Sequence, residues 1–414
     1  MDFSEGYRCS GPAPVFSPDG QFTAAAVEHR LIIREVETQR VVQLYPCLDR
    51  IDSLEWSPNS TYVLVGLFSR GIIQVWSVDS PDWSCKIDEG PAGVASVRWS
   101  PDGSCVLATS EFGLRVTVWS LRERSCAYLR GPKHVRAGAA FSADGAHLAV
   151  LERSEMKDWV TVYDTSSWGE AARFPLPTSD AADLAWSPEG GVLAVWDSCL
   201  QYKVALLDAS SGATLATYAA YGPEALGVKC VSWSPAGELL AVGSFDRVAR
   251  LLNHELDEPG PGPSSTARSL DPAARSKYVI TPLPASVPRL NPPLDAPSPK
   301  IGVGRCAWSG DGRFLATVED SSGPAVWVWD LGSMELGAVL LHMAPVTDLA
   351  WAPQGSTLAV VTGATKVHLW TPAGASIVHI PLPGFQAFGC SWSRGGTTLL
   401  VRGPDSFCCA YLTA

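Results

Sequence analysis

Short apolar runs alternate with polar turns along the whole chain, at a regular interval. An aromatic residue followed by a turn rich in Ser, Pro, Asp and Gly recurs nine times. These aromatic residues are Phe16, Trp56, Trp99, Phe141, Trp186, Trp233, Trp308, Trp351 and Trp392. All intervals but one lie between 40 and 47 residues, which is the length of one four-stranded propeller blade. The repeat therefore predicts a series of equivalent β-sheets.

The residues around each turn predict strands rather than helices. The run after each turn is apolar at consecutive positions, as in Val63–Leu64 and Leu358–Ala359, which indicates a strand covered on both faces. A further strand carries a large residue at one repeated position. The residues at this position are Trp76, Trp119, Tyr163, Trp329 and Trp370. None of these windows shows the 3.6-residue periodicity of a helix.

Nine units in 414 residues predict an all-β fold: a single β-propeller spanning residues 1–414, with eight to nine and most simply nine four-stranded blades. After Trp392 there is room for only two more strands, at 397–401 and 406–412. The last unit then lacks an outer strand, and residues 2–8 are available to supply it. We therefore expect the N- and C-terminal strands to close the propeller within one blade.

One interval, between Trp233 and Trp308, is longer by about 30 residues. Because proline cannot donate a ladder hydrogen bond, the proline-rich part of this segment is not a sheet interior. We expect residues 256–275 to form a flexible loop inserted in the sixth blade, and residues 276–280 to return as its outer strand. Thr281 and Ser298 each precede a proline and are candidate phosphorylation sites; ordinary loop composition is the alternative.

Composition narrows the classes of partner. With 46% hydrophobic residues the chain can bury a large core, which excludes global disorder. The net charge of −11 argues against general binding of nucleic acid or anionic membrane, although it permits a local basic patch. We find no apolar run long enough for a transmembrane helix and no secretory signal, so we expect reduced cysteines.

The sequence carries no recognisable catalytic or metal-binding motif. The seven histidines are scattered without the spacing of a zinc-protease helix, and no Cys-x-x-Cys pair is present. Phosphate-binding and nucleophile-elbow motifs are also missing. We therefore expect a protein that is not an enzyme, uses no cofactor and acts on no small-molecule substrate.

Function is then expected on the loops that join the second and third strands of each blade. Aromatic and arginine residues dominate binding hot spots. Two of these loops contain an aromatic residue together with an arginine, and a third contains two aromatic residues. The candidate partner-binding residues are Phe112 with Arg115; Trp196 with Tyr202 and Lys203; and Phe245 with Arg247. The alternative is that these aromatic side chains pack beneath their loops.

The aromatic-Ser-Pro-Asp-Gly turns and the strand-end tryptophans resemble the WD-repeat family over essentially the whole chain. Trp-Asp stands at a blade end only once, as Trp329-Asp330, and the usual Gly-His pairs are absent. The resemblance therefore implies that the family's buried Asp–His–Ser–Trp network is mostly missing and that stability rests on apolar packing.

Four stretches resemble one subfamily, the centrosomal and spindle-pole WD-repeat proteins encoded antisense to a p53-family gene. The stretches are residues 85–90, 192–203, 240–254 and 299–304. This resemblance implies a scaffold of centrosomes, centriolar satellites and spindle poles in the cytoplasm and cytoskeleton. It also implies roles in microtubule anchoring, spindle organisation and cilium assembly. The implied partners are a coiled-coil centrosomal anchoring protein and a minus-end-directed kinesin.

Two other functions remain open at this point. A propeller similar to a translation initiation factor would bind the ribosome through a basic stripe, and a pI near 5.1 disfavours it. A substrate receptor of a ubiquitin ligase would resemble proteins that carry Trp-Asp-x-Arg at a blade end. Here Gly332 stands two residues after Asp330, so that motif is missing.

Overall fold

The computed structural model describes residues 1–219, 227–253, 286–290, 292 and 299–412, and this part of the chain is built from β-strands. It forms nine antiparallel sheets. Its only helices are four single 3-10 turns: η1 (Phe68–Arg70), η2 (Gly90–Ala92), η3 (Glu111–Gly113) and η4 (Asp320–Ser322). The chain divides into two compact units, which are described separately.

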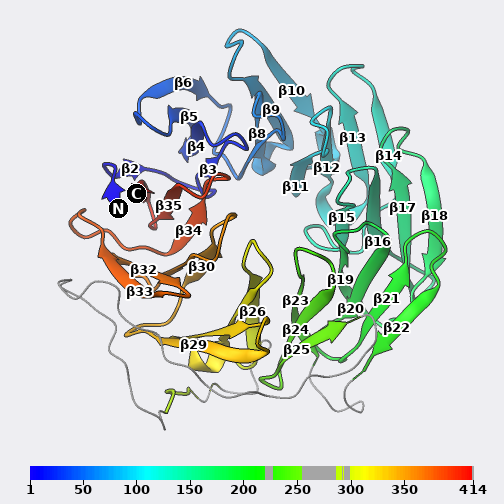
Figure 1. Cartoon of the computed structure of the whole chain (residues 1–414). Helices are drawn as coiled ribbons and strands as arrows, with labels where there is room; N and C mark the ends of the chain where they lie inside the picture. Colours follow the sequence, from blue (N-terminus) through cyan, green and yellow to red (C-terminus); the bar gives the residue numbers. More distant parts are fainter. Residues whose placement is uncertain (220–226, 254–285, 291, 293–298, 413–414) are drawn as a thin grey trace. The chain divides into compact units, whose positions relative to one another are not determined.

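Unit 2 comprises Arg8–Ser198 and Lys203–Ala220 and holds five four-stranded sheets. The strands of each sheet follow one another in chain order (Figure 1). The first sheet contains β3 (Val15–Phe16), β4 (Phe22–Val27), β5 (Arg30–Glu35) and β6 (Val41–Pro46). The second contains β7 (Ser53–Trp56), β8 (Tyr62–Leu67), β9 (Ile72–Ser77) and β10 (Ser84–Asp88). The third contains β11 (Ser96–Trp99), β12 (Cys105–Thr109), β13 (Val116–Ser120) and β14 (Cys126–Leu129). The fourth contains β15 (Ala139–Phe141), β16 (His147–Ser154), β17 (Lys157–Asp164) and β18 (Glu170–Pro175). The fifth is β19 (Ala181–Trp186), β20 (Val192–Asp197), β21 (Val204–Asp208), β22 (Thr214–Tyr218).

Unit 1 comprises Met1–Tyr7, Cys199–Tyr202 and Tyr221–Ala414 and holds the other four sheets. The sixth sheet has three described strands, β23 (Val228–Trp233), β24 (Leu239–Ser244) and β25 (Ala249–Asn253). The seventh contains β26 (Val303–Trp308), β27 (Phe314–Glu319), β28 (Ala325–Asp330) and β29 (Glu335–Leu341). The eighth contains β30 (Asp348–Trp351), β31 (Leu358–Val361), β32 (Lys366–Thr371) and β33 (Gly374–His379). The last contains β34 (Gly389–Trp392), β35 (Thr398–Arg402), β36 (Ser406–Tyr411), β1 (Asp2–Phe3) and β2 (Tyr7–Arg8), and both β1 and β2 pair with β36.

The predicted fold class is confirmed: the sheets are the nine blades of a β-propeller. The first strand of every blade ends at the repeated aromatic residue, as β7 ends at Trp56 and β30 ends at Trp351. The predicted outer strand at residues 276–280 and the flexible loop at 256–275 lie outside the described residues.

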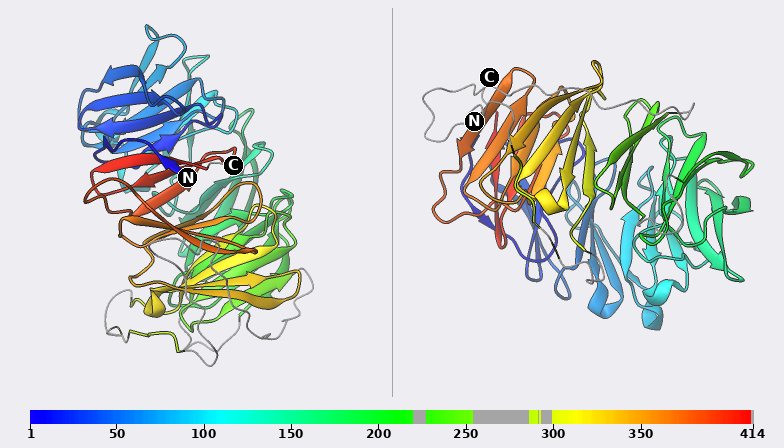
Figure 2. Two further views of the ribbon diagram at one scale, coloured as in Figure 1. Left: turned by 60° about the vertical axis from the view of Figure 1, so that its left-hand side comes forward. Right: turned by 90° about the horizontal axis from the view of Figure 1, so that it is seen from below.

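The predicted sharing of the last blade by both chain ends is also confirmed. Strand β1 pairs with β36 in antiparallel register, with Asp2 opposite Tyr411. The backbone N–H of Ser4 donates to the Cys409 carbonyl at 2.8 Å, and the Cys409 N–H donates to the Ser4 hydroxyl at 2.9 Å. The first and last described segments of the chain, blue and red, accordingly lie in one blade, as Figure 1 and the two views of Figure 2 show.

The turn after each aromatic residue is held by its serine. In the third blade the Ser100 hydroxyl accepts the Cys105 N–H at 2.9 Å and donates to the Asp102 carboxylate. Gly103 then adopts a φ of 71°, where its N–H donates to the Ser100 carbonyl and where a side chain would be strained. This bonding explains why Ser, Asp and Gly recur at fixed offsets.

The second strand of each blade is buried on both faces, as its pattern predicts. An alanine with no exposed surface recurs at one position of this strand. These residues are Ala24, Ala149, Ala194, Ala241, Ala316 and Ala359. Their small size allows the neighbouring blade to approach closely, and burial on both faces makes these strands the core of each unit.

Polar contacts between blades add to the apolar packing on which the sequence analysis expects stability to rest. In several blades the repeated tryptophan donates its indole N–H to a main-chain carbonyl in the first strand of the preceding blade. Trp186 reaches the Ala140 carbonyl at 2.8 Å, and Trp351 reaches that of Ala307 at 2.9 Å. The same contact recurs from Trp56 to Val15, Trp99 to Glu55, Trp308 to Ser232 and Trp392 to Ala350. The aromatic repeat therefore supplies hydrogen bonds as well as packing.

Candidate interaction surface

The loop between β12 and β13 presents the most exposed aromatic side chain among the described residues. The loop is closed at its base, where the Ser110 N–H donates to the Arg115 carbonyl at 3.1 Å and the Ser110 hydroxyl accepts the Arg115 N–H at 3.0 Å. Phe112 stands at the tip with 89% of its surface exposed, and Leu114 is 68% exposed. The sequence prediction thus placed Phe112 on an accessible loop, but it did not identify Leu114.

Arg115 leaves this loop toward a buried carboxylate and an exposed ring. Its guanidinium lies 3.6 Å from the carboxylate of Glu89, which is almost fully buried, and 4.7 Å from the centre of the Tyr128 ring. Glu89 also accepts the hydroxyl of Thr117 at 3.1 Å and the indole N–H of Trp119. Arg115 is thereby held in place, and Tyr128 is 60% exposed beside it.

Glu89 and Tyr128 were missed by the sequence analysis. Glu89 belongs to the stretch at residues 85–90 that carries the subfamily resemblance. The resemblance alone did not show that this stretch supplies the buried carboxylate that holds Arg115. Tyr128 lies in β14, the outer strand of its blade, where side chains of one face meet solvent. Its position in an outer strand is the signal that would have identified it.

Trp196 and Lys203, the second pair of candidates in unit 2, flank a buried carboxylate. Trp196 is half-buried near the end of β20, and the Lys203 ammonium donates to the carbonyl of Pro177. Between them Asp197 accepts the N–H groups of Ser179 at 3.1 Å and Asp180 at 2.9 Å. Burial raises the pKa of the Asp197 carboxyl, against the lowering effect of these hydrogen bonds. Asp197 and Lys203 thereby hold residues 177–180 against the end of β20 and the residues that follow it.

The aromatic candidates of unit 1 are buried. Tyr202 and Phe245 are each 6% exposed; the Arg250 guanidinium lies 5.3 Å from the Tyr202 ring and the Lys229 ammonium 4.8 Å from the Phe245 ring. For these two rings the structure favours packing beneath the loop over contact with a partner. Arg247 keeps 38% of its side chain exposed and lies 3.4 Å from Glu319. The candidates Thr281 and Ser298 lie outside the described residues.

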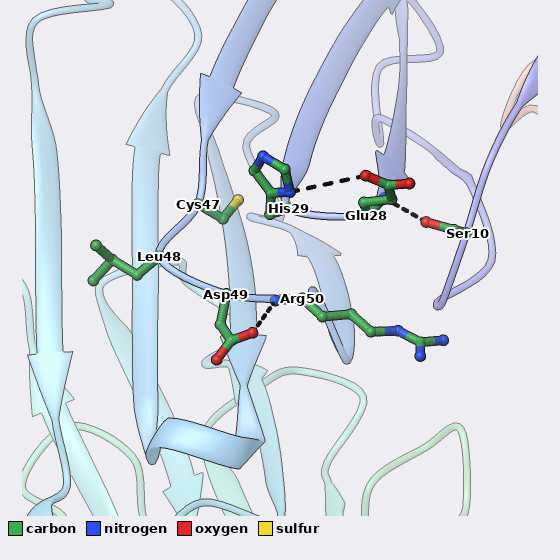
Figure 3. A pocket seen from close by; sticks show the side chains of 7 residues that line it. All are labelled: Ser10, Glu28, His29, Cys47, Leu48, Asp49 and Arg50. Carbon is green, nitrogen blue, oxygen red and sulfur yellow. Dashed lines mark hydrogen bonds and ion pairs between the residues drawn. The ribbon is translucent and has the colours of Figure 1, made fainter.

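Unit 2 also contains a pocket of about 590 Å³, shown in Figure 3. In it the imidazole of His29 lies 4.0 Å from the Glu28 carboxylate, and Ser10 accepts the Glu28 N–H at 2.5 Å. Burial raises the pKa of the Cys47 thiol to about 12, so this thiol is protonated at neutral pH. The pocket therefore lacks an activated cysteine nucleophile.

The rest of the described chain was searched for metal and membrane features. It contains no cluster of three or more His, Cys, Asp or Glu side chains arranged to hold a metal ion. All eleven cysteines are free thiols. Within the described ranges no helix is long and apolar enough to cross a membrane.

Comparison with known proteins identifies a family. The family model for the WD domain, G-beta repeat, matches residues 213–253. The chain is 41% identical to the mouse (Mus musculus) WD repeat-containing protein WRAP73, with all of this chain and 96% of that protein covered. It is 23% identical to an uncharacterised WD repeat-containing protein of Schizosaccharomyces pombe, over all of this chain and 93% of that protein.

A solved structure supports the fold. The C-terminal WD40 domain of Sif2 matches with a TM-score of 0.53 at 13% identity, over 88% of this chain and 96% of that one. The match with WRAP73 over the full chain confirms the resemblance drawn from the four stretches between residues 85 and 304.

Proposed function

This chain belongs to the WD-repeat family, and from that membership we propose that it is a non-enzymatic scaffold of the centrosome, centriolar satellites and spindle poles. In this role it helps to anchor microtubules, to organise the spindle and to assemble cilia. Its partners are a coiled-coil centrosomal anchoring protein and a minus-end-directed kinesin. Its place in the cell is the cytoplasm and cytoskeleton.

The observation that carries the proposal is the 41% identity with WRAP73 along the whole chain. The match covers all of this chain, so it extends over all nine blades. The exposed residues of the β12–β13 loop support the same kind of function, because a large apolar side chain held in solvent suits contact with another protein.

The test is localisation combined with loss of function. A fluorescently tagged chain expressed in dividing cells is expected to concentrate at spindle poles, beside γ-tubulin. Depletion of the endogenous protein is expected to slow the regrowth of focused microtubule asters after cold depolymerisation, and the tagged chain should restore it. A diffuse signal, or co-sedimentation with ribosomal subunits in a sucrose gradient, would refute the proposal and favour a ribosome-binding propeller.

A further inference from the structure

Two thiols of neighbouring blades lie against each other in unit 1. Cys230 belongs to β23, the first strand of the sixth blade, and Cys306 belongs to β26, the first strand of the seventh (Figure 1). Their sulfur atoms are 3.4 Å apart, although the residues are separated by 76 positions in the chain. The Cys230 sulfur also lies 3.5 Å from the Val303 carbonyl oxygen in β26. The fold therefore makes direct neighbours of two cysteines that are distant in sequence, and we call them the thiol pair.

Polar contacts hold the two strands of the thiol pair together. The Trp308 indole N–H donates to the Ser232 carbonyl at 3.1 Å, which joins β26 to β23. The Lys229 ammonium donates to the Ile301 carbonyl at 2.8 Å and pairs with the Asp320 carboxylate. These contacts lie on both sides of the thiol pair in the sequence, so they keep the two sulfur atoms close.

The surroundings of the thiol pair leave room for the sulfur of Cys230. The residue opposite Cys230 in β24 is Gly243, and a Cβ atom added there would lie 2.6 Å from the Cys230 sulfur. The absence of a side chain at position 243 therefore makes space for the thiol. Both members of the pair are partly exposed, whereas Cys408 and Cys409 are buried. A small oxidant can therefore reach the thiol pair.

The two thiols differ in acidity. When Cys230 is ionised, its sulfur can only accept, and the hydrogen bond from the Cys306 thiol lowers the pKa of Cys230 against the raising effect of burial. The Gly243 N–H and the Lys229 ammonium lower this pKa further. The same contact with Cys230, together with burial, raises the pKa of Cys306. Because the thiolate is the nucleophile, Cys230 is the member of the pair that reacts first.

We propose that the thiol pair is an oxidation site for hydrogen peroxide, at which Cys230 and Cys306 form a reversible disulfide between the sixth and seventh blades. The Cys230 thiolate attacks one peroxide oxygen, and the O–O bond breaks. This step leaves a sulfenic acid on Cys230 and releases hydroxide, which takes up the proton that Cys230 lost and becomes water.

The second step closes the disulfide. The Cys306 sulfur attacks the Cys230 sulfur, the S–O bond breaks, and the departing hydroxide takes the Cys306 thiol proton and leaves as a second water. The two sulfur atoms together lose two electrons, and the peroxide gains them. The sulfur atoms move from 3.4 Å to about 2.0 Å apart.

The disulfide would close residues 230–306 into one covalent loop. This loop contains the long interval between Trp233 and Trp308, so the bond ties two blades across the longest gap in the repeat. Closing a long loop restricts the unfolded chain and thereby stabilises the folded one. The site is independent of the proposed function, because it depends only on contacts within unit 1.

Peptide mapping of the purified full-length chain tests the site. The reduced chain is exposed briefly to dilute hydrogen peroxide, denatured, blocked with iodoacetamide and digested with trypsin. Cleavage places each cysteine of the pair in a peptide of its own, residues 230–247 and 306–313. We expect mass spectrometry to find these two peptides joined in the monomer band of a non-reducing gel, and separated by dithiothreitol. No linkage, or linkage only between different molecules, would overturn the proposal.

Serine variants separate the roles of the two thiols. Cys306→Ser should lose the linkage and accumulate sulfenic acid on Cys230, which dimedone traps. Cys230→Ser should lose the linkage and give little dimedone adduct on Cys306. Cys390→Ser is the matched control, because Cys390 is also partly exposed and also stands two residues before the tryptophan of its blade. This control should form the linkage as the wild type does. Equal dimedone labelling of Cys230 and Cys306 in these variants would contradict the assigned order of reaction.

Thermal unfolding shows whether the disulfide belongs to the native fold. The oxidised chain should melt about 5–15 °C above the reduced chain, and dithiothreitol should remove the difference. Peroxide should not raise the melting midpoint of Cys230→Ser. Linkage accompanied by an unchanged or lower midpoint would mean that the bond forms in unfolded molecules or distorts the blades, and it would refute the proposal.

Discussion

Removal of the N-terminal strand should destabilise the last blade. In a variant that lacks residues 2–5, β36 loses its neighbour β1, and the Cys409 N–H and carbonyl lose both of their contacts with Ser4. Phe3, which packs against the core of this blade, is lost as well. The two hydrogen bonds contribute about 1 kcal/mol each and the half-buried Phe3 about 1–2 kcal/mol, so the loss is about 3–4 kcal/mol.

The assay is thermal unfolding together with hydrogen–deuterium exchange read by mass spectrometry. For a unit of this size the loss corresponds to a fall of about 6–16 °C in the melting midpoint. Exchange should accelerate in the peptide that contains residues 406–411, where the Cys409 amide has lost its acceptor. Asp2→Asn is the control, because Asp2 is exposed and the substitution leaves the backbone pairing intact.

Unchanged melting and unchanged exchange in the deletion variant would refute this reasoning. They would show that β1 adds nothing to the stability of the last blade. Equal destabilisation by Asp2→Asn would show instead that the carboxylate, rather than strand pairing, carries the effect.

Three further predictions concern buried groups. Burial lowers the pKa of His342 to about 4 and that of His368 to about 3, so the unfolded chain binds their protons first. The contribution of these two histidines to stability should be constant above pH 6.5 and decline as the pH falls toward 4. His368→Phe should flatten that decline in urea unfolding curves, and an unchanged slope would contradict this reasoning. Glu89→Ala should lower the free energy of unfolding by about 1–3 kcal/mol, because it leaves the hydroxyl of Thr117 and the indole N–H of Trp119 without their acceptor. Urea unfolding measures this loss, and Glu123→Ala, at an exposed glutamate, is the control. Iodoacetamide followed by mass spectrometry should label exposed Cys126 in the native protein but buried Cys408 only after denaturation; native labelling of Cys408 would contradict its burial.

The fold was predictable because its signal is repeated. Each blade places an aromatic residue at the end of its first strand, and nine copies of one weak local pattern outweigh the ambiguity of any single copy. Closure of the last blade by residues 2–8 followed from counting strands, since the last unit had too few, whereas the register that pairs Asp2 with Tyr411 was found only in the structure. Sequence spacing does not show hydrogen-bond direction, so the bonds from Trp186 and Trp351 to preceding blades were found only in the structure.

The candidate surface was predictable only in part. Composition identified the aromatic loops, but it did not show that Tyr202 and Phe245 are buried beside the cationic side chains of Arg250 and Lys229, which lie on other segments of the chain. Phe112 and Gly113 both have positive φ angles in this exposed loop. A glycine at position 113 is compatible with this conformation, but its presence in the sequence does not predict it. Neighbours from other strands, such as Tyr128, become visible only when the sheet is assembled.

Proximity labelling in dividing cells tests most directly whether this chain acts as a centrosomal scaffold. When a biotin ligase is fused to the chain, centrosomal and spindle-pole proteins should be enriched among the biotinylated proteins, relative to a control in which the ligase is free. Enrichment of ribosomal proteins without any centrosomal protein would contradict it.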